Sequence, residues 1–389
     1  GRSRVDPATT APLTMGGVHY LDYAATAPLR PEALAAMQRQ WSQVGNPSSL
    51  HTAGRAARRV VEESREQIAA LIAAKPADIV FTSGGTEADN LGLKGIAMAS
   101  SKRRLLVGAA EHHAVLDPAA ALAGQGFQVD YLPVDALGRI DVDYLADALS
   151  DDVALVAVMW ANNEVGTIQP IDEVARLCRR HHVPLHSDAV QVLGQLDLDV
   201  SGVTSVAISA HKVGGPVGVG ALVLDRNQAV SPLLHGGGQE RDVRSGTVDA
   251  AGIAGFAAAL AAPKVDVRPL RDDLIRQVMV TVPDAVLNGD PVERLPNNAH
   301  FSFPGCPGDA LLMLLDAQGV AVSTGSACTA GIPQPSHVLM AMGADEDLAG
   351  SSLRFSLGWA SSQSDVDALA AALPQAVERA RRAGGRRRS

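Results

Sequence analysis

Lys212 and Asp188 are ionisable side chains that closely follow apolar runs of this sequence. Lys212 stands between residues 205–209 and a glycine-rich turn, where an ammonium group would lose hydration. Such a lysine gives up its proton readily and can then form a Schiff base with a carbonyl compound, although an exposed loop lysine is the plainer interpretation. Asp188 follows residues 183–186, and a carboxylate at the end of a buried strand needs a cationic or hydrogen-bonding partner.

Three further segments end in polar residues that are weaker signals when taken singly. After residues 78–82 the chain continues Ser-Gly-Gly-Thr-Glu. Glycines at a strand-to-helix turn let backbone N–H groups approach a phosphate, but a plain tight turn with Thr86 as the N-cap explains them equally well. His112 follows residues 105–108 and Asn163 follows residues 153–159. A lone histidine in such a place is more often structural than catalytic.

The cysteines argue for a reducing environment and for one reactive thiol. Cys178, Cys306 and Cys328 form an odd set without metal-ligand spacing, which disfavours a disulfide framework. A free cysteine is usually a small buried hydrophobe, and this interpretation suits Cys178 and Cys306. Cys328 differs because residues 323–335 are small residues and turn formers without an apolar period, which predicts an exposed, mobile loop.

The elements that position these residues alternate between helix and strand. Helical patterns cover residues 31–41, 56–73 and about 86–99, and strand patterns cover 78–82, 105–108, 153–159, 183–186, 205–209 and 219–224. This alternation is typical of an α/β sheet with helices on both faces, whose ligands gather at the carboxyl ends of the strands. A charged helix over residues 267–280 then begins a smaller α+β segment.

We therefore expect a large domain over residues 31–265 and a small α+β domain, formed by 15–30 with 266–383, that carries the Cys328 loop. Residues 1–14 are expected to be an expression remnant or a disordered leader. The basic end of the chain, residues 384–389, is expected to be solvated.

Composition excludes several classes of protein. Of 389 residues, 47% are hydrophobic and 19% are charged, which fits a globular chain and not a disordered one. The net charge of −9 does not suggest a protein that binds nucleic acid. The longest uncharged apolar stretch, residues 250–263, is too short for a bilayer, which needs ~20 residues. We expect no membrane contact and a cytoplasmic location.

Several motifs, in their order along residues 18–380, resemble the class-V aminotransferase-like cysteine desulfurases of group I, the NifS-like type, which are fold-type-I pyridoxal 5'-phosphate (PLP) enzymes. The motifs lie at residues 20–26, 45–51, 81–87, 162–166, 235–241, 244–247 and 326–329. The resemblance implies an α/β fold whose large domain has a mainly parallel seven-stranded sheet flanked by helices, with a smaller α+β domain beside it.

The same resemblance implies roles around PLP. Lys212 would form the Schiff base with the cofactor. Asp188 would pair with the pyridine N–H and so keep the ring an electron sink. Gln191 would hydrogen-bond the ring hydroxyl, and His112 would stack on the ring and handle protons. The phosphate would be held by Gly85, Thr86, Ser209 and His211. Thr247 of a neighbouring subunit would complete that site, which implies a homodimer.

Asn163, beside the ring, and Arg354 resemble the residues that bind the substrate carboxylate, a task that suits the planar guanidinium fork. The implied reaction converts L-cysteine to L-alanine and leaves sulfur on Cys328 as a persulfide, which the mobile loop presents to an acceptor protein. Two alternatives remain: a selenocysteine lyase or cysteine β-lyase, and a dimer that kept the fold without the chemistry.

The destination of the sulfur stays open between iron–sulfur assembly, tRNA thiolation and DNA phosphorothioation. After residues 377–382 the chain stops at Ser389. By comparison with the family it resembles, we expect the longer tail with which the housekeeping iron–sulfur type docks its scaffold protein to be missing. We therefore expect that a specialised sulfur donor is also possible, and that any role in DNA modification goes through partner proteins and not through direct contact with nucleic acid.

Overall fold

The computed structural model describes residues 17–326, 328–329 and 332–387, so the leader expected over residues 1–14 lies outside the described part. A central sheet of seven strands has the order β2-β8-β7-β6-β5-β3-β4. The strands are β2 (Ile79–Thr82), β3 (Arg104–Gly108), β4 (Gln128–Leu132), β5 (Val153–Ala157), β6 (Leu185–Asp188), β7 (Ser205–Ser209) and β8 (Gly220–Leu224). β8 is antiparallel to both of its neighbours, and the other pairs are parallel.

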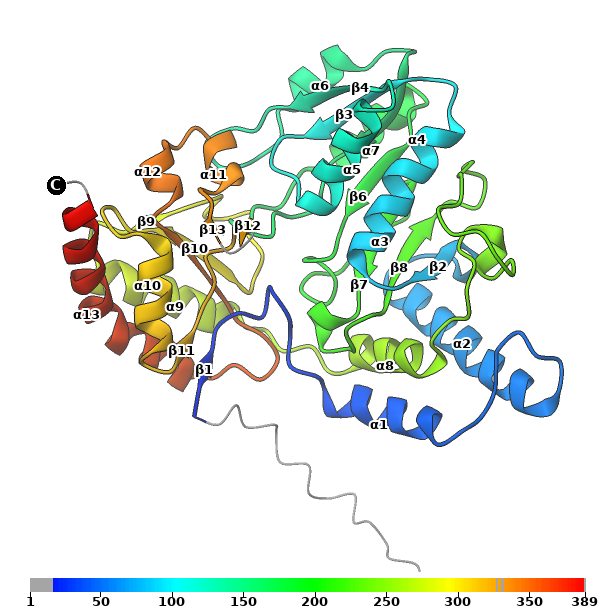
Figure 1. Ribbon diagram of the computed structural model, residues 1–389, viewed down its shortest axis with the longest axis horizontal. Coiled ribbons are helices and arrows are strands. Elements are labelled where there is room, and N and C mark those ends of the chain that lie inside the picture. Colours follow the sequence, from blue (N-terminus) through cyan, green and yellow to red (C-terminus); the bar gives the residue numbers. More distant parts are fainter. Residues whose placement is uncertain (1–16, 327, 330–331, 388–389) are drawn as a thin grey trace, which may run out of the picture.

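Helices cover both faces of this sheet (Figure 1). Ile79 and Phe81 of β2 belong to the hydrophobic cluster under one layer, and Val80 between them belongs to the cluster under the other. This alternation follows from the two-residue period of a strand. The first layer contains α1 (Pro31–Trp41), α2 (Thr52–Leu71) and α8 (Ala250–Ala261). The second contains α3 (Gly85–Asn90), the π-helical η2 (Leu91–Gly95), α4 (Ile96–Ala99) and α5 (His113–Ala123).

Two more helices, α6 (Val142–Ala148) and α7 (Ile171–Arg180), pack near β5 in a further cluster. α7 has its apolar residues on one face, acidic residues in its first turn and Arg179 and Arg180 in its last. Charges of these signs stabilise the two ends of a helix dipole. β5, β7 and β8 are buried along their whole length, which explains why their sequences are almost continuously apolar.

Most of the remaining elements form a separate hydrophobic cluster beside the large sheet (Figure 1), whereas Val338, Leu339 and Ala349 pack in a small cluster with Ala110 and Val165. The sheets of these elements have the orders β14-β10-β9 and β1-β11. The strands are β1 (His19–Tyr20), β9 (Val286–Leu287), β10 (Asn298–Ser302), β11 (Val320–Ala321) and β14 (Ser352–Ser356). The helices are α9 (Arg268–Thr281), α10 (Gly308–Asp316), α11 (His337–Ala341), α12 (Glu346–Ala349) and α13 (Gln363–Arg387). Phe301, Phe303 and Phe355 pack against one another at the centre of the separate cluster.

The segment between β1 and α1 connects the two clusters and passes the carboxyl ends of the large sheet. Asp22 forms a β-bridge with Ser356 of β14, and the Ala24 N–H donates to the Ser356 hydroxyl over 2.9 Å. Gly358 packs so closely on Tyr23 that a Cβ there would lie 1.9 Å from the ring. The backbone of residues 22–26 is thereby held in one place, and its carbonyl groups take part in the site described next.

Candidate active site

The structure brings together most of the site residues expected from the sequence, at the carboxyl ends of adjacent strands. Asp188 is the last residue of β6, and Ser209 is the last of β7. His112 and Asn163 follow β3 and β5, and Lys212 lies in the short helix η3 (His211–Val213) after β7. The charge of Asp188 acts on both Lys212 and His112. The parallel order of β3, β5, β6 and β7 is what places these strand ends along one edge.

Lys212 is held by backbone oxygens in a partly buried position. Its Nζ donates to the Ala24 carbonyl over 2.5 Å and to the Ala25 carbonyl over 2.9 Å. Burial, and after it the positive charge of Arg354, lower the pKa of Lys212 from 10.5 to about 8. Asp188 and Asp22 oppose that shift. A substantial fraction of this amine is therefore unprotonated, and nucleophilic, near neutral pH.

His112 is the N-cap of α5, and its Nδ1 accepts a hydrogen bond of 3.0 Å from the Ala114 N–H. Burial lowers its pKa, and the nearby positive charge of Lys212 acts in the same direction, whereas Asp188 opposes both. An imidazole that accepts through Nδ1 and stays neutral carries its proton on Nε2. The cap therefore fixes both the tautomer and the orientation of the ring.

Asp188 and Gln191 are both fixed by the backbone. The Asp188 Oδ1 accepts from the Val190 N–H over 2.9 Å, and the residue is 7% exposed. The Gln191 amide donates to the Ala24 carbonyl over 3.0 Å. Gln191 and Lys212 thus share one acceptor, which links the ends of β6 and β7 to the segment before α1.

The residues expected around a phosphate form a place that fits an anion. Gly85 begins α3, and a Cβ there would lie 2.8 Å from the Val190 side chain, so a larger residue is not accommodated. Thr86 is exposed in the first turn. The buried Ser209 hydroxyl finds no hydrogen-bond partner within the described residues. A free hydroxyl beside the start of a helical segment is a suitable ligand for a phosphate group.

His211 belongs to the same region. Its Nδ1 lies 3.1 Å from the Thr26 hydroxyl. Burial lowers its pKa to about 4, and Lys212 contributes to that shift. His211 is therefore neutral at physiological pH and can donate one hydrogen bond without adding positive charge.

Arg354 has an unused hydrogen-bond donor that fits a carboxylate. Arg354 donates to the Asn163 carbonyl over 2.8 Å and to the Asp22 carboxylate over 3.0 Å. Its side chain is 5% exposed. In the part of the chain that the structure describes, the Arg354 Nε and the Asn163 Oδ1 have no partner. His300 faces Arg354 across β10 and β14, and its Nε2 is likewise unpaired there, a buried feature that the sequence analysis missed.

Cys328 lies in β12 (Cys328–Thr329), which pairs antiparallel with β13 (Ile332–Pro333). A hairpin therefore stands where the sequence predicted an irregular loop. The Cys328 side chain lies outside the described part of the structure. The segment starts beside Arg354, because a Cβ at Gly325 would lie 3.5 Å from the Arg354 Cβ. It ends at Ser336, whose hydroxyl donates to the buried Glu164 carboxylate.

The other two cysteines do not compete for this position. Cys178 and Cys306 are both 1% exposed. Burial raises the pKa of the Cys178 thiol to about 12 and also raises that of Cys306. Neither sulfur is a thiolate at neutral pH, and the thiolate is the reactive form of cysteine.

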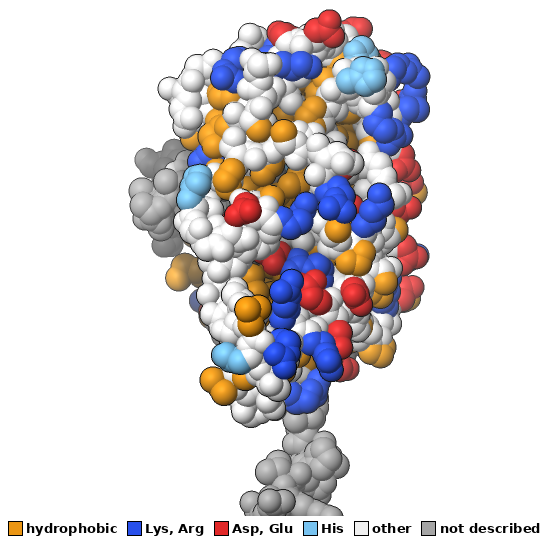
Figure 2. All heavy atoms as spheres, turned by 90° about the vertical axis from the view of Figure 1, so that its right-hand side faces the viewer, with side chains coloured by type: hydrophobic (Ala, Val, Ile, Leu, Met, Phe, Trp, Pro, Cys, Tyr) orange, Lys and Arg blue, Asp and Glu red, His pale blue; other side chains and the backbone are white. Residues whose placement is uncertain are grey.

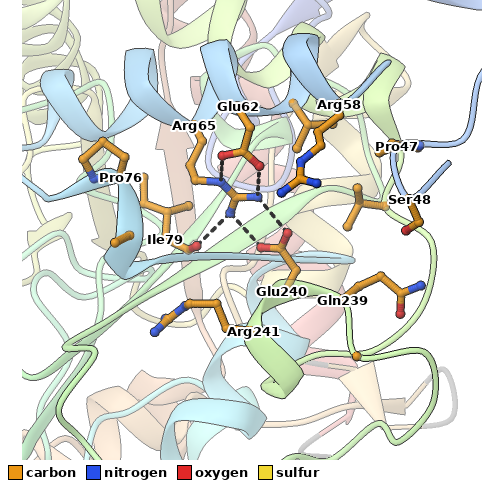
Figure 3. A pocket seen from close by; sticks show the side chains of 14 residues that line it. Pro47, Ser48, Arg58, Glu62, Arg65, Pro76, Ile79, Gln239, Glu240 and Arg241 are labelled. Atoms are coloured by element: carbon orange, nitrogen blue, oxygen red, sulfur yellow. Dashed lines mark hydrogen bonds and ion pairs between the residues drawn. The ribbon is translucent and has the colours of Figure 1, made fainter. Parts of the chain in front are cut away.

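Thr247 lies apart from these residues, exposed in the segment between η4 (Glu240–Asp242) and α8. The start of this segment is anchored as Figure 3 shows: Arg65 donates to the Glu240 carboxylate over 2.7 and 2.8 Å. The anchor holds three successive non-glycine residues at φ angles of 48°, 60° and 59°. Each such residue costs roughly 1–2 kcal/mol, so the buried ion pair offsets real strain.

A cavity of about 570 Å³ lies beside this anchor (Figure 3). None of the site residues expected from the sequence lines it. Because none of those residues lines the cavity, the candidate active site is the strand-end cluster around Lys212.

The face of the molecule that includes α2 carries a band of Lys and Arg side chains with acidic ones among them, and exposed hydrophobic side chains near it (Figure 2).

Comparison with known proteins gives the family. The profile of Aminotransferase class-V matches residues 19–369, and the chain belongs to that family. The IscS-like cysteine desulfurase of Mycobacterium tuberculosis is 52% identical over 383 residues, which cover 94% of this chain and 97% of that protein. This confirms the family and the α/β fold class expected from the sequence.

Two solved structures show the same fold. A NifS-like protein has a TM-score of 0.85 and 34% identity, and the match covers 92% of this chain and 99% of that one. SspA in complex with cysteine has a TM-score of 0.80 and 33% identity, with 87% and 98% covered. Among the described residues, no helix is both long and apolar enough to cross a membrane, and no group of side chains is arranged to hold a metal ion.

Proposed function

We propose that this protein is a PLP-dependent cysteine desulfurase, which converts L-cysteine to L-alanine and transfers the sulfur to Cys328. The observation that carries the proposal is the partly buried Lys212, whose lowered pKa reflects desolvation and the charges of Arg354 and Asp188, at the carboxyl ends of the sheet. Two relatives support L-cysteine as the substrate. One is the IscS-like cysteine desulfurase, which matches 94% of this chain, and the other is SspA, whose structure is a complex with cysteine.

When bound, PLP supplies an electron sink that stabilises negative charge on the α-carbon of an amino acid. The chain would hold it as follows. Lys212 would bond to its aldehyde, and Asp188 would accept the hydrogen bond of the protonated ring nitrogen. Gln191 would serve the ring hydroxyl, and His112 would cover the ring. The phosphate ligands are Gly85, Thr86, Ser209 and His211.

Lys212 and His112 are also the groups that move protons. The free amine of Lys212, with a pKa of about 8, would act as the base that takes the α-proton of the substrate. His112 is neutral through burial and carries its proton on Nε2, so it can donate there and later recover it. The Arg354 guanidinium would bind the substrate carboxylate through its Nε–H, which has no partner among the described residues, and Asn163 would donate to that carboxylate through its amide nitrogen.

The sulfur step balances without an added oxidant. The Cys328 thiolate attacks the sulfur of the substrate, an S–S bond forms and the C–S bond breaks. The electron pair of that bond passes to the former β-carbon, which takes a proton and leaves as the methyl group of alanine. The thiol of Cys328 has become a persulfide, and an acceptor protein then takes its outer sulfur. Iron–sulfur assembly, tRNA thiolation and DNA phosphorothioation are the candidate destinations, and the cytoplasm is the proposed location.

A homodimer is part of the proposal, with Thr247 of each copy completing the phosphate site of the other. Thr247 is exposed on an anchored segment, as a residue that serves a neighbour must be. Three large apolar side chains support an interface on the same part of the fold: Trp41, at the end of α1, is 62% exposed, and Val44 and Leu50, between α1 and α2, are 87% and 83% exposed. We also propose that the two separate hydrophobic clusters belong to two domains, residues 31–265 and residues 15–30 with 266–383.

The test is the production of alanine and sulfide from L-cysteine with a thiol reductant, comparing wild type with Cys328→Ala. Both proteins should bind PLP equally, because Cys328 does not hold the cofactor. The proposal expects alanine and sulfide in equal amounts from wild type and neither from the variant. Equal activity of the two proteins would mean direct β-elimination, and a cysteine β-lyase or selenocysteine lyase would replace the desulfurase.

A further inference from the structure

Behind Asp188 lies a series of three hydrogen-bonded polar side chains that the proposed reaction does not use. The Ser205 hydroxyl lies 2.8 Å from the Nδ1 of His186, and the Nε2 of His186 lies 3.0 Å from the Oδ1 of Asp89. The Asp89 carboxyl in turn is within hydrogen-bonding reach of the Asp188 carboxyl. Ser205 and His186 are fully buried and Asp89 is 1% exposed, so solvent water does not replace any of these contacts.

Three elements of the fold position these side chains. His186 and Asp188 alternate on β6 and therefore point to the same face of the sheet. Ser205 is the register partner of His186 on β7. Asp89 comes from α3, which widens into the π-helical η2 directly after it, and in η2 a Cβ at Gly92 would lie 2.4 Å from the imidazole. π-Helical turns are rare and are found mostly at functional sites, and only glycine allows this approach to His186.

The neighbouring groups decide where the protons sit. Two buried carboxyls within hydrogen-bonding reach do not both ionise. Burial, the charge of Asp188 and that of the nearby Glu111 all raise the pKa of Asp89 well above its usual range. Burial lowers the pKa of His186 to about 3, so the imidazole is neutral. Glu111 uses its Oε1 to accept from the Met159 N–H over 2.6 Å, and its Oε2 has no partner among the described residues.

One arrangement of the protons gives each of these side chains a hydrogen-bond partner. The Ser205 O–H donates to Nδ1 of His186, the Nε2–H donates to one oxygen of Asp89, and the protonated second oxygen of Asp89 donates to Asp188. All hydrogen bonds then point the same way, toward the end of β6, and Asp188 carries the single negative charge.

We propose that Asp89, held by His186 and Ser205, is a neutral positioning residue that donates a hydrogen bond to Asp188 and keeps that residue ionised toward the cofactor ring. Asp188 then accepts from Asp89 and from the Val190 N–H. These two donors would hold the carboxylate in place for its contact with the protonated ring nitrogen. This consequence rests on the proposed function, whereas the protonation of Asp89 does not.

The first test uses the protein without PLP, so it does not depend on the proposed reaction. Infrared spectra of protein labelled with carbon-13 at the aspartate carboxyls should show a protonated aspartic acid at neutral pH. The band should vanish in Asp89→Asn and persist in Glu111→Gln, a matched control with a buried carboxyl. Absence of the band from wild type, or its survival in Asp89→Asn, would overturn the proposal.

The second test compares Asp89→Asn with Asp89→Ala in the PLP-loaded enzyme. Asparagine reproduces a neutral group with one donor toward Asp188 and one acceptor toward His186, whereas alanine removes both. We expect Asp89→Asn to keep kcat within about threefold and to keep the pH dependence of the cofactor absorbance. Asp89→Ala should lower kcat by about tenfold or more and shift that pH dependence.

Equal impairment of the two variants would show that Asp89 acts as an anion, and would contradict the proposal. Unfolding by urea of the PLP-free proteins provides the folding control. If Asp89 is protonated, Asp89→Asn is at least as stable as wild type at neutral pH. If it is instead ionised and paired with His186, the same variant leaves that pair broken and loses stability.

Discussion

Replacing Lys212 by methionine tests the electrostatic argument for this lysine without any cofactor. The partly buried Lys212 has a pKa of about 8, compared with 10.5 for an exposed lysine. Below pH 8 the folded state must accommodate an ammonium group at a cost of roughly 3 kcal/mol relative to the unfolded chain, since one pKa unit corresponds to about 1.4 kcal/mol. Methionine has similar length and no charge, so the variant does not bear this cost.

The sign of the pH dependence follows from proton binding. Between about pH 8 and pH 10.5 the unfolded chain holds a proton on Lys212 that the folded protein has released. The free energy of unfolding of wild type should therefore rise with pH relative to Lys212→Met. Between about pH 7 and about pH 9.5 the difference between the two proteins should change by roughly 2 kcal/mol.

The assay is urea unfolding of the PLP-free proteins across this pH range, with Lys75→Met as the control, because Lys75 is exposed. The control should show no such change with pH. A difference between wild type and Lys212→Met that stays constant across the range would refute the lowered pKa. With a pKa of about 8, about a quarter of Lys212 is unprotonated at about pH 7.5, whereas an exposed lysine is unprotonated in roughly one part in a thousand. Without the lowered pKa, Lys212 would therefore have almost no neutral amine at this pH.

Two further predictions concern stability and thiol reactivity. Arg65→Met leaves the buried Glu240 carboxylate without its cation and should cost about 3–5 kcal/mol in urea unfolding, whereas the exposed Arg58→Met should cost less than about 0.5 kcal/mol; equal costs would contradict the role of the ion pair. Cys178 should resist alkylation in the native protein at about pH 8 and react only after unfolding, because burial raises its pKa to about 12. Rapid labelling of native Cys178 would show that this burial is wrong.

The sequence predicted the elements whose apolar pattern is strong and local. The helix expected over residues 31–41 is α1, with the same bounds. The strand expected over residues 205–209 is β7, also with the same bounds. Asp188 was expected just after a strand and is the last residue of β6. Polar residues at strand ends pointed to most of the site because parallel strands bring their carboxyl ends together.

What the sequence did not reveal depends on contacts between distant segments. β4 was missed because it lies at the sheet edge, where partial exposure interrupts its apolar pattern. The hairpin at Cys328 has two short strands and no apolar period to mark them. Asp89 looked like an ordinary polar residue of a helix, and only the fold places it against His186, which lies 97 residues away. The spacing of His186 and Asp188 on one strand face was the available signal.

The most direct test of the central claim is the location of the transferred sulfur. The PLP-loaded protein would be mixed with L-cysteine in the absence of reductant, its thiols and persulfides alkylated, and its peptides analysed by mass spectrometry. The account predicts one extra sulfur atom on the peptide that contains Cys328, together with an equal amount of alanine, and none on the peptides of the buried Cys178 and Cys306. Alanine formed without extra sulfur on Cys328, or extra sulfur carried by another cysteine, would contradict it.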